Sequence, residues 1–311
     1  MLLLAAAAAG CGSSRPIPHG ILGGSAIEPS VHFRGASVTG SVYVVAGPAA
    51  ANGRHILYPG DVYLIRGAPA DARRLTDSLA NSGGIESVTA DGRDVMVTGR
   101  HGEVKQLLVG PTTAAWGPNL GTGLLPTMGA GGRYLFVEFN CGRACGAEGF
   151  LIRAGRIGHR RQRVAVRARA PSSNADASVA AWEPGGEIAL LLGRRVILDA
   201  GTSRAHELGG LRHFPFSAGS YLVGGGPHGM LALSGPREIA LLTPGGRMRV
   251  IRTSAAPDSF SPDGRNLLVT DFPSVGGPSQ LSLISTTTGA ITPLISTDGH
   301  IDWAAWGGGG G

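Results

Sequence analysis

Two cysteines in the segment FNCGRACGAEG, Cys141 and Cys145, are the residues whose type and spacing point most directly to chemistry. A disulfide needs Cα atoms about 4.4–6.8 Å apart, so residues four positions apart must lie on a turn, which Gly142 and Gly146 make easy. The spacing is not that of a CxxC redox pair, and no second cysteine motif or nearby histidine pair completes four metal ligands. We therefore expect a local disulfide, with the redox pair and the metal site as alternatives.

No catalytic motif accompanies these cysteines. The chain has no GxSxG nucleophile elbow, no HExxH and no phosphate-binding loop. Its 9 histidines are dispersed, and its carboxylates fall mainly at predicted strand ends and turns. We expect no cofactor and no metal ion, and the sequence identifies no catalytic residue. An enzyme that gathers its site from distant segments is the alternative.

Arginine supplies nearly all of the positive charge, and the densest run lies between residues 153 and 169. Alternate positions of its second half carry the arginines, namely Arg161, Arg163, Arg167 and Arg169. This period of two predicts a strand with an arginine outer face and an apolar inner face. A solvated, edge-protecting face is the simplest interpretation, and contact with anionic lipid headgroups or cell-wall polymer is the alternative. We expect no nucleic-acid binding, because no aromatic residues interleave the run.

The elements that hold these residues are predicted to be short β-strands. Of 311 residues, 52 are Gly and 20 are Pro, while 42% are hydrophobic and 15% are charged. Gly or Pro interrupts almost every window of ten, which excludes helix bundles and coiled coils. The glycines follow no three-residue period, which excludes collagen. The hydrophobic content and low charge exclude a disordered polyelectrolyte. The composition therefore predicts a β protein whose short strands are separated by glycine-rich turns.

The first residues, MLLLAAAAAGCGSS, combine a short apolar run with small residues. Eight apolar residues make about 12 Å of helix, too short to cross a bilayer of about 30 Å. Such a run is typical of a secretory signal, and Ala8 to Cys11 resemble the lipobox of bacterial lipoproteins. The resemblance implies cleavage before Cys11 and lipidation of this cysteine, which would anchor the protein on the extracytoplasmic face of the cell membrane. A signal cut elsewhere, or a mis-called start, is the alternative.

Turns with a small or acidic residue before Gly recur about every 42 residues, each followed by a β-prone run. In chain order the predicted turn residues are Asn52, Gly53, Asp91, Gly92, Gly131, Gly132, Pro184, Gly186, Gly229, Pro262, Asp263 and Gly264. Pro fixes φ, Asp or Asn caps the turn, and Gly accepts positive φ. One predicted strand precedes each turn and three follow it. Four strands in about 40 residues are typical of a propeller blade.

The string FSPDGR at 260–265, with TTTGAITPLIST at 286–297 and HIDWAAW at 300–306, resembles the WD40-like or TolB-type (PD40-like) β-propeller repeat. Weaker copies are AAWEPGGEIA at 180–189 and ADGRDVMV at 90–97. The resemblance implies an all-β propeller of four-stranded antiparallel blades. We predict six blades, with seven as the alternative. Either the strand at 300–306 joins the N-terminal region to close the ring, or the chain is cut short.

The predicted organisation has a lipoprotein signal at 1–10, a lipidated cysteine and flexible tether at 11–30, a propeller at 31–306 and a glycine tail at 307–311. The predicted function is that of a non-catalytic, monomeric scaffold in the bacterial cell envelope, which binds a protein or cell-wall component. A propeller enzyme of lactonase or lyase type is the alternative, and a purely structural surface protein is a third hypothesis. We expect Trp182, Trp303 and Trp306 to pack between blades rather than bind a ligand.

Overall fold

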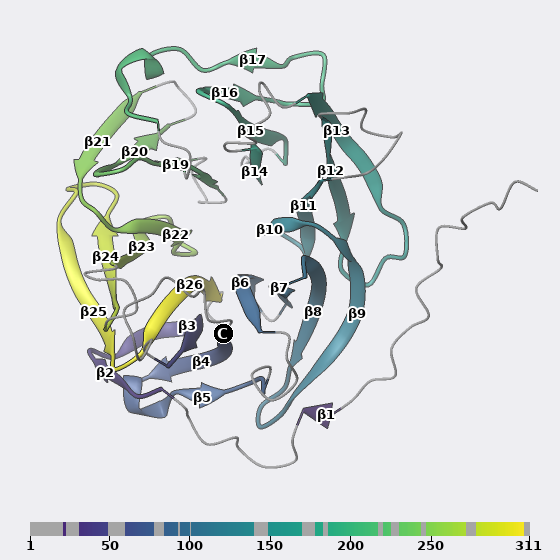
Figure 1. Cartoon of the computed structure of the whole chain (residues 1–311). Coiled ribbons are helices and arrows are strands. Elements are labelled where there is room, and N and C mark those ends of the chain that lie inside the picture. Colours follow the sequence, from purple (N-terminus) through teal and green to yellow (C-terminus); the bar gives the residue numbers. More distant parts are fainter. Residues whose placement is uncertain are drawn as a thin grey trace, which may run out of the picture.

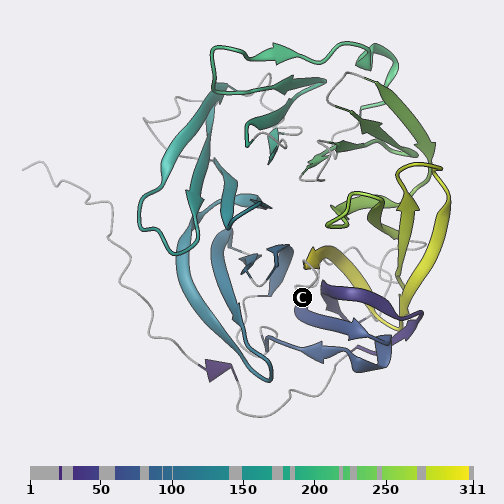
Figure 2. The same ribbon diagram turned by 180° about the vertical axis from the view of Figure 1, so that it is seen from behind.

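A computed structural model of the chain confirms the all-β propeller of six four-stranded antiparallel blades around a central axis (Figure 1). It describes residues 21–22, 31–48, 60–77, 84–92, 94–99, 101–139, 149–169, 178–182, 186–216, 220–224, 230–243, 247–271 and 278–307. Seen from behind, the same ring of sheets surrounds the axis (Figure 2). The helices of the described part are two 3-10 turns, η1 (Pro69–Asp71) and η3 (Leu211–His213).

Each blade runs from an innermost strand at the axis to an outermost strand at the rim. Blades 1 to 3 comprise β6 (Ile85–Asp91), β7 (Asp94–Gly99), β8 (Glu103–Val109) and β9 (Ala114–Thr122); β10 (Leu124–Gly129), β11 (Arg133–Phe139), β12 (Gly149–Arg156) and β13 (Arg163–Arg169); and β14 (Ser178–Trp182), β15 (Ile188–Leu192), β16 (Arg195–Leu198) and β17 (His206–Glu207).

Blades 4 to 6 complete the ring. They comprise β18 (Leu222–Val223), β19 (Leu231–Ser234), β20 (Glu238–Leu242) and β21 (Met248–Arg252); β22 (Ala256–Phe260), β23 (Asn266–Asp271), β24 (Gln280–Ser285) and β25 (Ile291–Thr297); and β26 (His300–Gly307), β3 (Val38–Gly47), β4 (Asp61–Gly67) and β5 (Arg73–Arg74). Two short strands add to the rim: β1 (Ile21–Leu22) on β9 and β2 (Phe33–Gly35) on β25. Strand β1 thus pairs two residues of the predicted tether.

Blade 6 closes the ring with strands from both ends of the propeller. Strand β26 runs antiparallel to β3, with Ala304 opposite Val44 and Trp306 opposite Val42. This is the first of the two arrangements predicted for HIDWAAW. Closure leaves no unpaired sheet edge at the junction between the first and last strands.

The hydrophobic core lies between adjacent blades. Tyr43 and Val45 of blade 6, for example, belong to one buried cluster with Val88 and Val97 of blade 1. These strands are apolar on both faces because each blade is covered on either side by a neighbour. Burying such a side chain contributes about 1.5–3 kcal/mol. The packing fixes where each innermost strand stands at the axis.

The predicted turns explain several sharp connections between innermost and second strands. Gly92, Gly131, Gly132, Gly186 and Gly264 all have positive φ, from 64° to 84°. Such φ values are in the region that glycine adopts without steric cost.

In the strongest copy of the turn, Asp263 Oδ1 accepts hydrogen bonds from Ser261 Oγ at 2.6 Å and Arg265 N at 3.0 Å. These bonds hold the pKa of the exposed Asp263 carboxyl below its ordinary value. The side chain therefore caps the turn, as the sequence predicts.

Other predicted sites lie outside the described residues: Cys11, Asn52, Gly53, Cys141, Cys145, Pro184 and Gly229. The chain order nevertheless bears on the first of the predicted turns. Strands β3 and β4 pair directly as the second and third strands of blade 6. Asn52 and Gly53 therefore fall between the second and third strands, whereas the other predicted turns join the first and second. Blade 6 differs because its first strand comes from the end of the propeller.

The arginine-rich segment forms β13, the outermost strand of blade 2. Arg163 and Arg167 are exposed, whereas Val164 and Val166 are partly buried. Arg161 is exposed just before the strand, and Arg169 is its last residue. The arginines of this segment whose side chains are described are thus exposed, but Ala165 between them packs against the same core cluster as Val166, so the two faces do not alternate strictly. Contact with an anionic surface stays a prediction.

Candidate functional site

A cavity of about 280 Å³ lies at the centre of the ring, and we call it the axial pocket. Strands β6, β10, β22 and β26 line it, together with residues 221–224 around β18. Most of the lining lies toward the C-terminal ends of these strands and the turns that follow them. The pocket therefore depends on five blades, and none of them could form it alone.

Asp258 of β22 is the most unusual residue of the pocket. Pro257 pairs with Val269 and Ser259 pairs with Leu268, so Asp258 is the extra residue of a β-bulge. Its side chain is only 5% exposed. Asp258 Oδ2 accepts a hydrogen bond of 2.6 Å from Thr270 Oγ1.

The backbone N–H of Ala304 also donates to the Asp258 carboxyl. Burial nevertheless raises the pKa of Asp258 well above its ordinary value, because two neutral donors do not offset the cost of removing the charge from water. Raised pKa values of this kind cluster at binding and catalytic sites.

An aromatic pair stands beside Asp258. The rings of Tyr221 and Trp303 are 5.4 Å apart between centroids and tilted by 39°. Tyr221 is fixed before β18 by two hydrogen bonds with Ser234: its N–H donates to Ser234 Oγ at 2.8 Å, and its carbonyl accepts from Ser234 N at 2.9 Å. Burial, and then the charge of Asp258, raise the pKa of Tyr221 well above its ordinary value. The two acidic groups are therefore close enough to affect each other.

Strand β26 brings two tryptophans to the pocket. Trp303 and Trp306 both line it and are both partly exposed. Trp306 N donates to Ser259 Oγ at 2.9 Å, which ties β26 to the bulged strand β22. The expectation of pure packing holds for Trp182, which is 4% exposed within a core cluster. Trp303 and Trp306 pack against core clusters and also line the pocket.

The acidic bulge recurs in three neighbouring innermost strands. Glu86 of β6, Asp258 of β22 and Asp302 of β26 each stand where the ladder register shifts. In the strings ESVTADGR and DSFSPDGR, the acid stands five residues before the turn aspartate. Sequence reasoning missed these residues, although aligning the copies over eight positions would have shown the first two.

Their surroundings separate the three acids. Glu86 is exposed, and Asp302 Oδ2 lies 3.2 Å from His300 Nε2. Only Asp258 belongs to the lining of the axial pocket. The repeated bulge therefore supplies this cavity with one buried acid that has no Lys or Arg beside it in the described lining.

Blade 2 lines the opposite part of the pocket with a strained bulge. Leu125 has a φ of +52°, a left-handed conformation that costs about 1–2 kcal/mol for a residue other than glycine. Its side chain packs against the core cluster of blades 3 and 4. Strained backbone of this kind is concentrated at binding sites, where the surroundings hold it in place.

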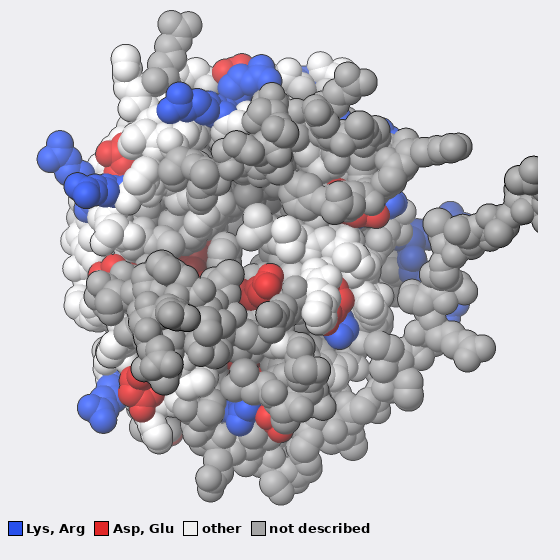
Figure 3. Space-filling model, viewed as in Figure 1, with Lys and Arg blue, Asp and Glu red and all other residues white. Residues whose placement is uncertain are grey.

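The described lining of the pocket is acidic in composition, whereas the chain as a whole is basic. The chain has a net charge of +6, yet the charged residues in the described lining are Asp91 and Asp258. In Figure 3, acidic side chains lie beside the central opening, and most described Lys and Arg side chains lie toward the outside. Among the described residues, no three His, Cys, Asp or Glu side chains form a group that could hold a metal ion.

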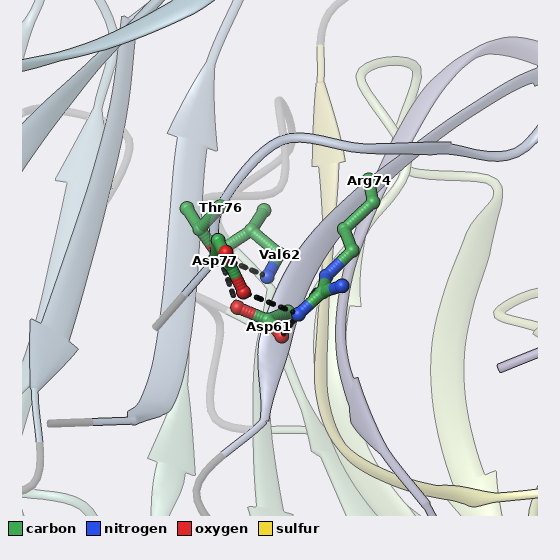
Figure 4. A network of polar contacts seen from close by, with 5 residues as sticks. All are labelled: Asp61, Val62, Arg74, Thr76 and Asp77. Atoms are coloured by element: carbon green, nitrogen blue, oxygen red, sulfur yellow. Dashed lines mark hydrogen bonds and ion pairs between the residues drawn. The ribbon is translucent and has the colours of Figure 1, made fainter. Parts of the chain in front are cut away.

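A second polar cluster lies in blade 6 (Figure 4). Asp61 is fully buried, and its Oδ2 accepts from Arg74 Nε at 3.1 Å and from an Arg74 terminal nitrogen at 2.6 Å. Thr76 Oγ1 donates to Asp61 Oδ1 at 2.8 Å and accepts from Val62 N at 3.0 Å. Arg74 also reaches Asp77 at 2.9 Å. The cluster ties β4 to β5 and the residues after it, so its role is structural.

A purely structural surface protein needs no polar cluster facing the channel, whereas acidic and hydroxyl side chains line the axial pocket. No helix in the described part is long and apolar enough to span a membrane.

Comparisons with known proteins identify the fold alone. No protein-family model matches the chain, and no curated protein matches it in sequence. A protein of unknown function from Bacteroides caccae is similar in structure, with a TM-score of 0.51, 10% identity, and coverage of 86% of this chain and 98% of that one.

Two further structures are similar at lower TM-scores. One is a gluconolactonase, XC5397 from Xanthomonas campestris, at 0.47 with 12% identity, covering 92% of this chain and 95% of that one. The other is YCF48 bound to D1 peptide, at 0.44 with 12% identity, covering 88% and 86%. Likeness at this level of identity carries no function from these proteins to this chain.

Proposed function

We propose that this propeller is an exported, lipid-anchored scaffold of the bacterial cell envelope that binds a partner segment in its axial pocket. The observation that carries the proposal is the convergence of aromatic and acidic side chains from different blades on one central cavity. A concave site in which aromatic side chains and converging polar groups meet is a common form of binding site. The partner is a protein or a cell-wall component.

Site-specific photo-crosslinking in the producing cells tests this binding role. Ala130 lines the pocket and is exposed, so p-benzoylphenylalanine in its place should capture the bound partner. Met248, on the outermost strand of blade 4 and 40% exposed, is the matched control position. We expect one adduct of defined mass from position 130 and none from position 248. No adduct from position 130, or the same adduct from both positions, contradicts the proposal.

The anchor is supported by the short apolar run at residues 2–9, which lies just before Cys11. Several acyl chains on one cysteine hold a protein firmly, since each buried methylene adds about 0.8 kcal/mol. The exposed Arg163 and Arg167 on the rim would add attraction to anionic headgroups. The variant Cys11→Ala should appear in the medium instead of the membrane fraction. Unchanged membrane association of Cys11→Ala would exclude this anchor.

One observation favours an enzyme as a second candidate. A buried carboxyl with a raised pKa, such as that of Asp258, has the character of a general acid. A propeller of lactonase or lyase type would use it on a small envelope substrate. Assay of the purified protein against a lactone panel tests this candidate. Turnover that is lost in Asp258→Asn supports it, and equal rates for both proteins reject Asp258 as the acid.

A further inference from the structure

We propose that the axial pocket binds an organic cation, a guanidinium or alkylammonium group, between the carboxylate of Asp258 and the rings of Tyr221 and Trp303. The inference deepens the proposed function and rests on it, because it identifies the bound part of the partner as a Lys or Arg side chain. Three observations support this assignment: an acid with no counter-charge in the described lining, tryptophans that line the cavity, and the size of that cavity.

The first observation is the missing counter-charge. Asp258 is held by Thr270 Oγ1 and a backbone N–H, and the described lining of the pocket contains no Lys or Arg. A buried carboxylate is normally compensated by a cation, because isolated charge is costly in a low dielectric. A cation placed in the pocket would supply that partner and would also face the ring of Tyr221.

The second observation comes from the four tryptophans of the chain. Two of them already have cations over their rings: Lys105 Nζ lies 5.6 Å from the centroid of Trp116, and Arg133 Cζ lies 5.3 Å from that of Trp182. The other two, Trp303 and Trp306, face the cavity. Tryptophan is the aromatic side chain that attracts cations most strongly. These two rings are therefore placed to receive a cation from a ligand.

The third observation is size. A cavity of about 280 Å³ is at or below the lower end of the range that holds drug-sized ligands, roughly 300–1,000 Å³. It therefore suits a single side chain or a small amine better than a larger ligand. The apolar rings would cover the methylene groups of a Lys or Arg stem, while the acid receives the charged end.

Binding should release a proton, since the cation favours the ionised form of Asp258. Affinity should therefore rise as pH rises toward the pKa of Asp258 in the free protein. Among the described residues, the other titratable groups near β22 are Tyr221 and Asp91 around the pocket, and His300, Asp302 and Asp271 on the strands packed against it. The pairing of His300 with Asp302 leaves Asp258 as the buried acid that gains most from an added cation.

Calorimetric titration with a blocked tripeptide, acetyl-Ala-Arg-Ala-amide, tests the inference on the unchanged protein. Its counterpart with citrulline in place of arginine has nearly the same shape and no charge. At about pH 8 we expect the arginine peptide to bind at least about tenfold more tightly, a difference of about 1.4 kcal/mol. The enthalpy should also differ between phosphate and Tris buffers, because the released proton is taken up by the buffer. Equal affinities, or no binding of the arginine peptide, would overturn the inference.

Two matched variants locate the site. Asp258→Asn should weaken binding of the arginine peptide at least about tenfold and abolish the buffer dependence. Asp302→Asn changes the equivalent bulge residue of the neighbouring strand, outside the pocket lining, and should leave the affinity within about threefold. Circular dichroism confirms that each variant folds. Equal losses in the two variants would contradict the assignment to Asp258.

A third ligand separates this inference from the proposed function. n-Butylguanidinium carries the same cation without a peptide. If it binds as tightly as the arginine peptide while crosslinking from position 130 finds no partner, the cation inference stands and partner capture fails. If crosslinking from position 130 finds a partner while the arginine and citrulline peptides bind equally, the proposed function stands and the cation inference fails.

Discussion

Asp61 and Asp258 are two buried aspartates of the same fold that differ in whether a described cation lies beside them. Asp61 is 0% exposed and Asp258 is 5% exposed, and each accepts a hydrogen bond from a threonine hydroxyl, at 2.8 Å from Thr76 and 2.6 Å from Thr270. Asp61 also has the guanidinium of Arg74 within its own blade. Asp258 has no described cation at that distance and stands at a cavity between blades.

The difference separates a structural acid from a candidate functional one. Where a buried charge only holds strands together, the chain supplies its counter-ion and satisfies the surrounding donors, as blade 6 does for Asp61. At Asp258 a raised pKa shows that compensation is incomplete. A local loss of stability of this kind is common at sites that bind a ligand.

The largest expected effect concerns the paired acid. Asp61→Ala leaves the partly buried Arg74 without its main partner, so it should lower the free energy of unfolding by about 3–5 kcal/mol, measured by urea denaturation. Asp298→Ala is the control, because its pair with His32 is exposed, with side-chain exposures of 53% and 73%. That variant should lose less than about 1 kcal/mol. Equal losses of unfolding free energy in Asp61→Ala and Asp298→Ala would contradict the view that the pair of Asp61 with Arg74 stabilises the fold more than an exposed pair does.

Replacing each threonine that donates a hydrogen bond to Asp61 or Asp258 by valine tests the same comparison of the two acids. Thr76→Val removes a donor to a charged carboxylate, at a cost of about 1.5–3 kcal/mol. Thr270→Val should cost less near neutral pH, about 0.5–1.5 kcal/mol, because its acceptor holds less negative charge there. Paired chemical denaturation curves measure both. A larger loss in Thr270→Val would mean that Asp258 is the more strongly ionised acid.

The smallest expected effect has the opposite sign. A native pKa raised above that of the unfolded chain means that the folded protein holds more protons, so stability falls as pH rises through that interval. Asp258→Asn removes this loss. It should therefore stabilise the protein by about 1 kcal/mol at about pH 8 and leave stability nearly unchanged at about pH 4. Thermal unfolding of both proteins at each pH measures the difference, and a variant less stable at about pH 8 would contradict it.

The sequence predicted the fold from its turns because these turns act locally. Asp263 caps its turn with its own side chain, and Gly264 accepts the positive φ that the turn needs. Because neither feature depends on distant residues, the string FSPDGR predicts this turn from the sequence alone. The turn at Asn52 and Gly53 was placed between the wrong strands of its blade, because the first strand of that blade comes from the far end of the chain.

The axial pocket was not predictable in the same way. Tyr221, Asp258 and Trp303 come from three blades, and each is unremarkable in its own segment. The bulge that places Asp258 depends on a register shift against β23, which no local propensity encodes. The tryptophans of β26 were expected to pack because burial is the commonest role of such residues in a propeller.

Strand β26 also sets the order of events when the protein is made. His300 Nδ1 lies 2.9 Å from Pro48 O across 252 positions of sequence, so this contact forms only when almost the whole propeller has been synthesised. The same strand carries Trp303 and Trp306, so neither tryptophan can reach the pocket on an unfinished chain. Contacts this distant in sequence form slowly. Ligand binding would therefore be the last property that the molecule acquires, and it would report that the ring has closed.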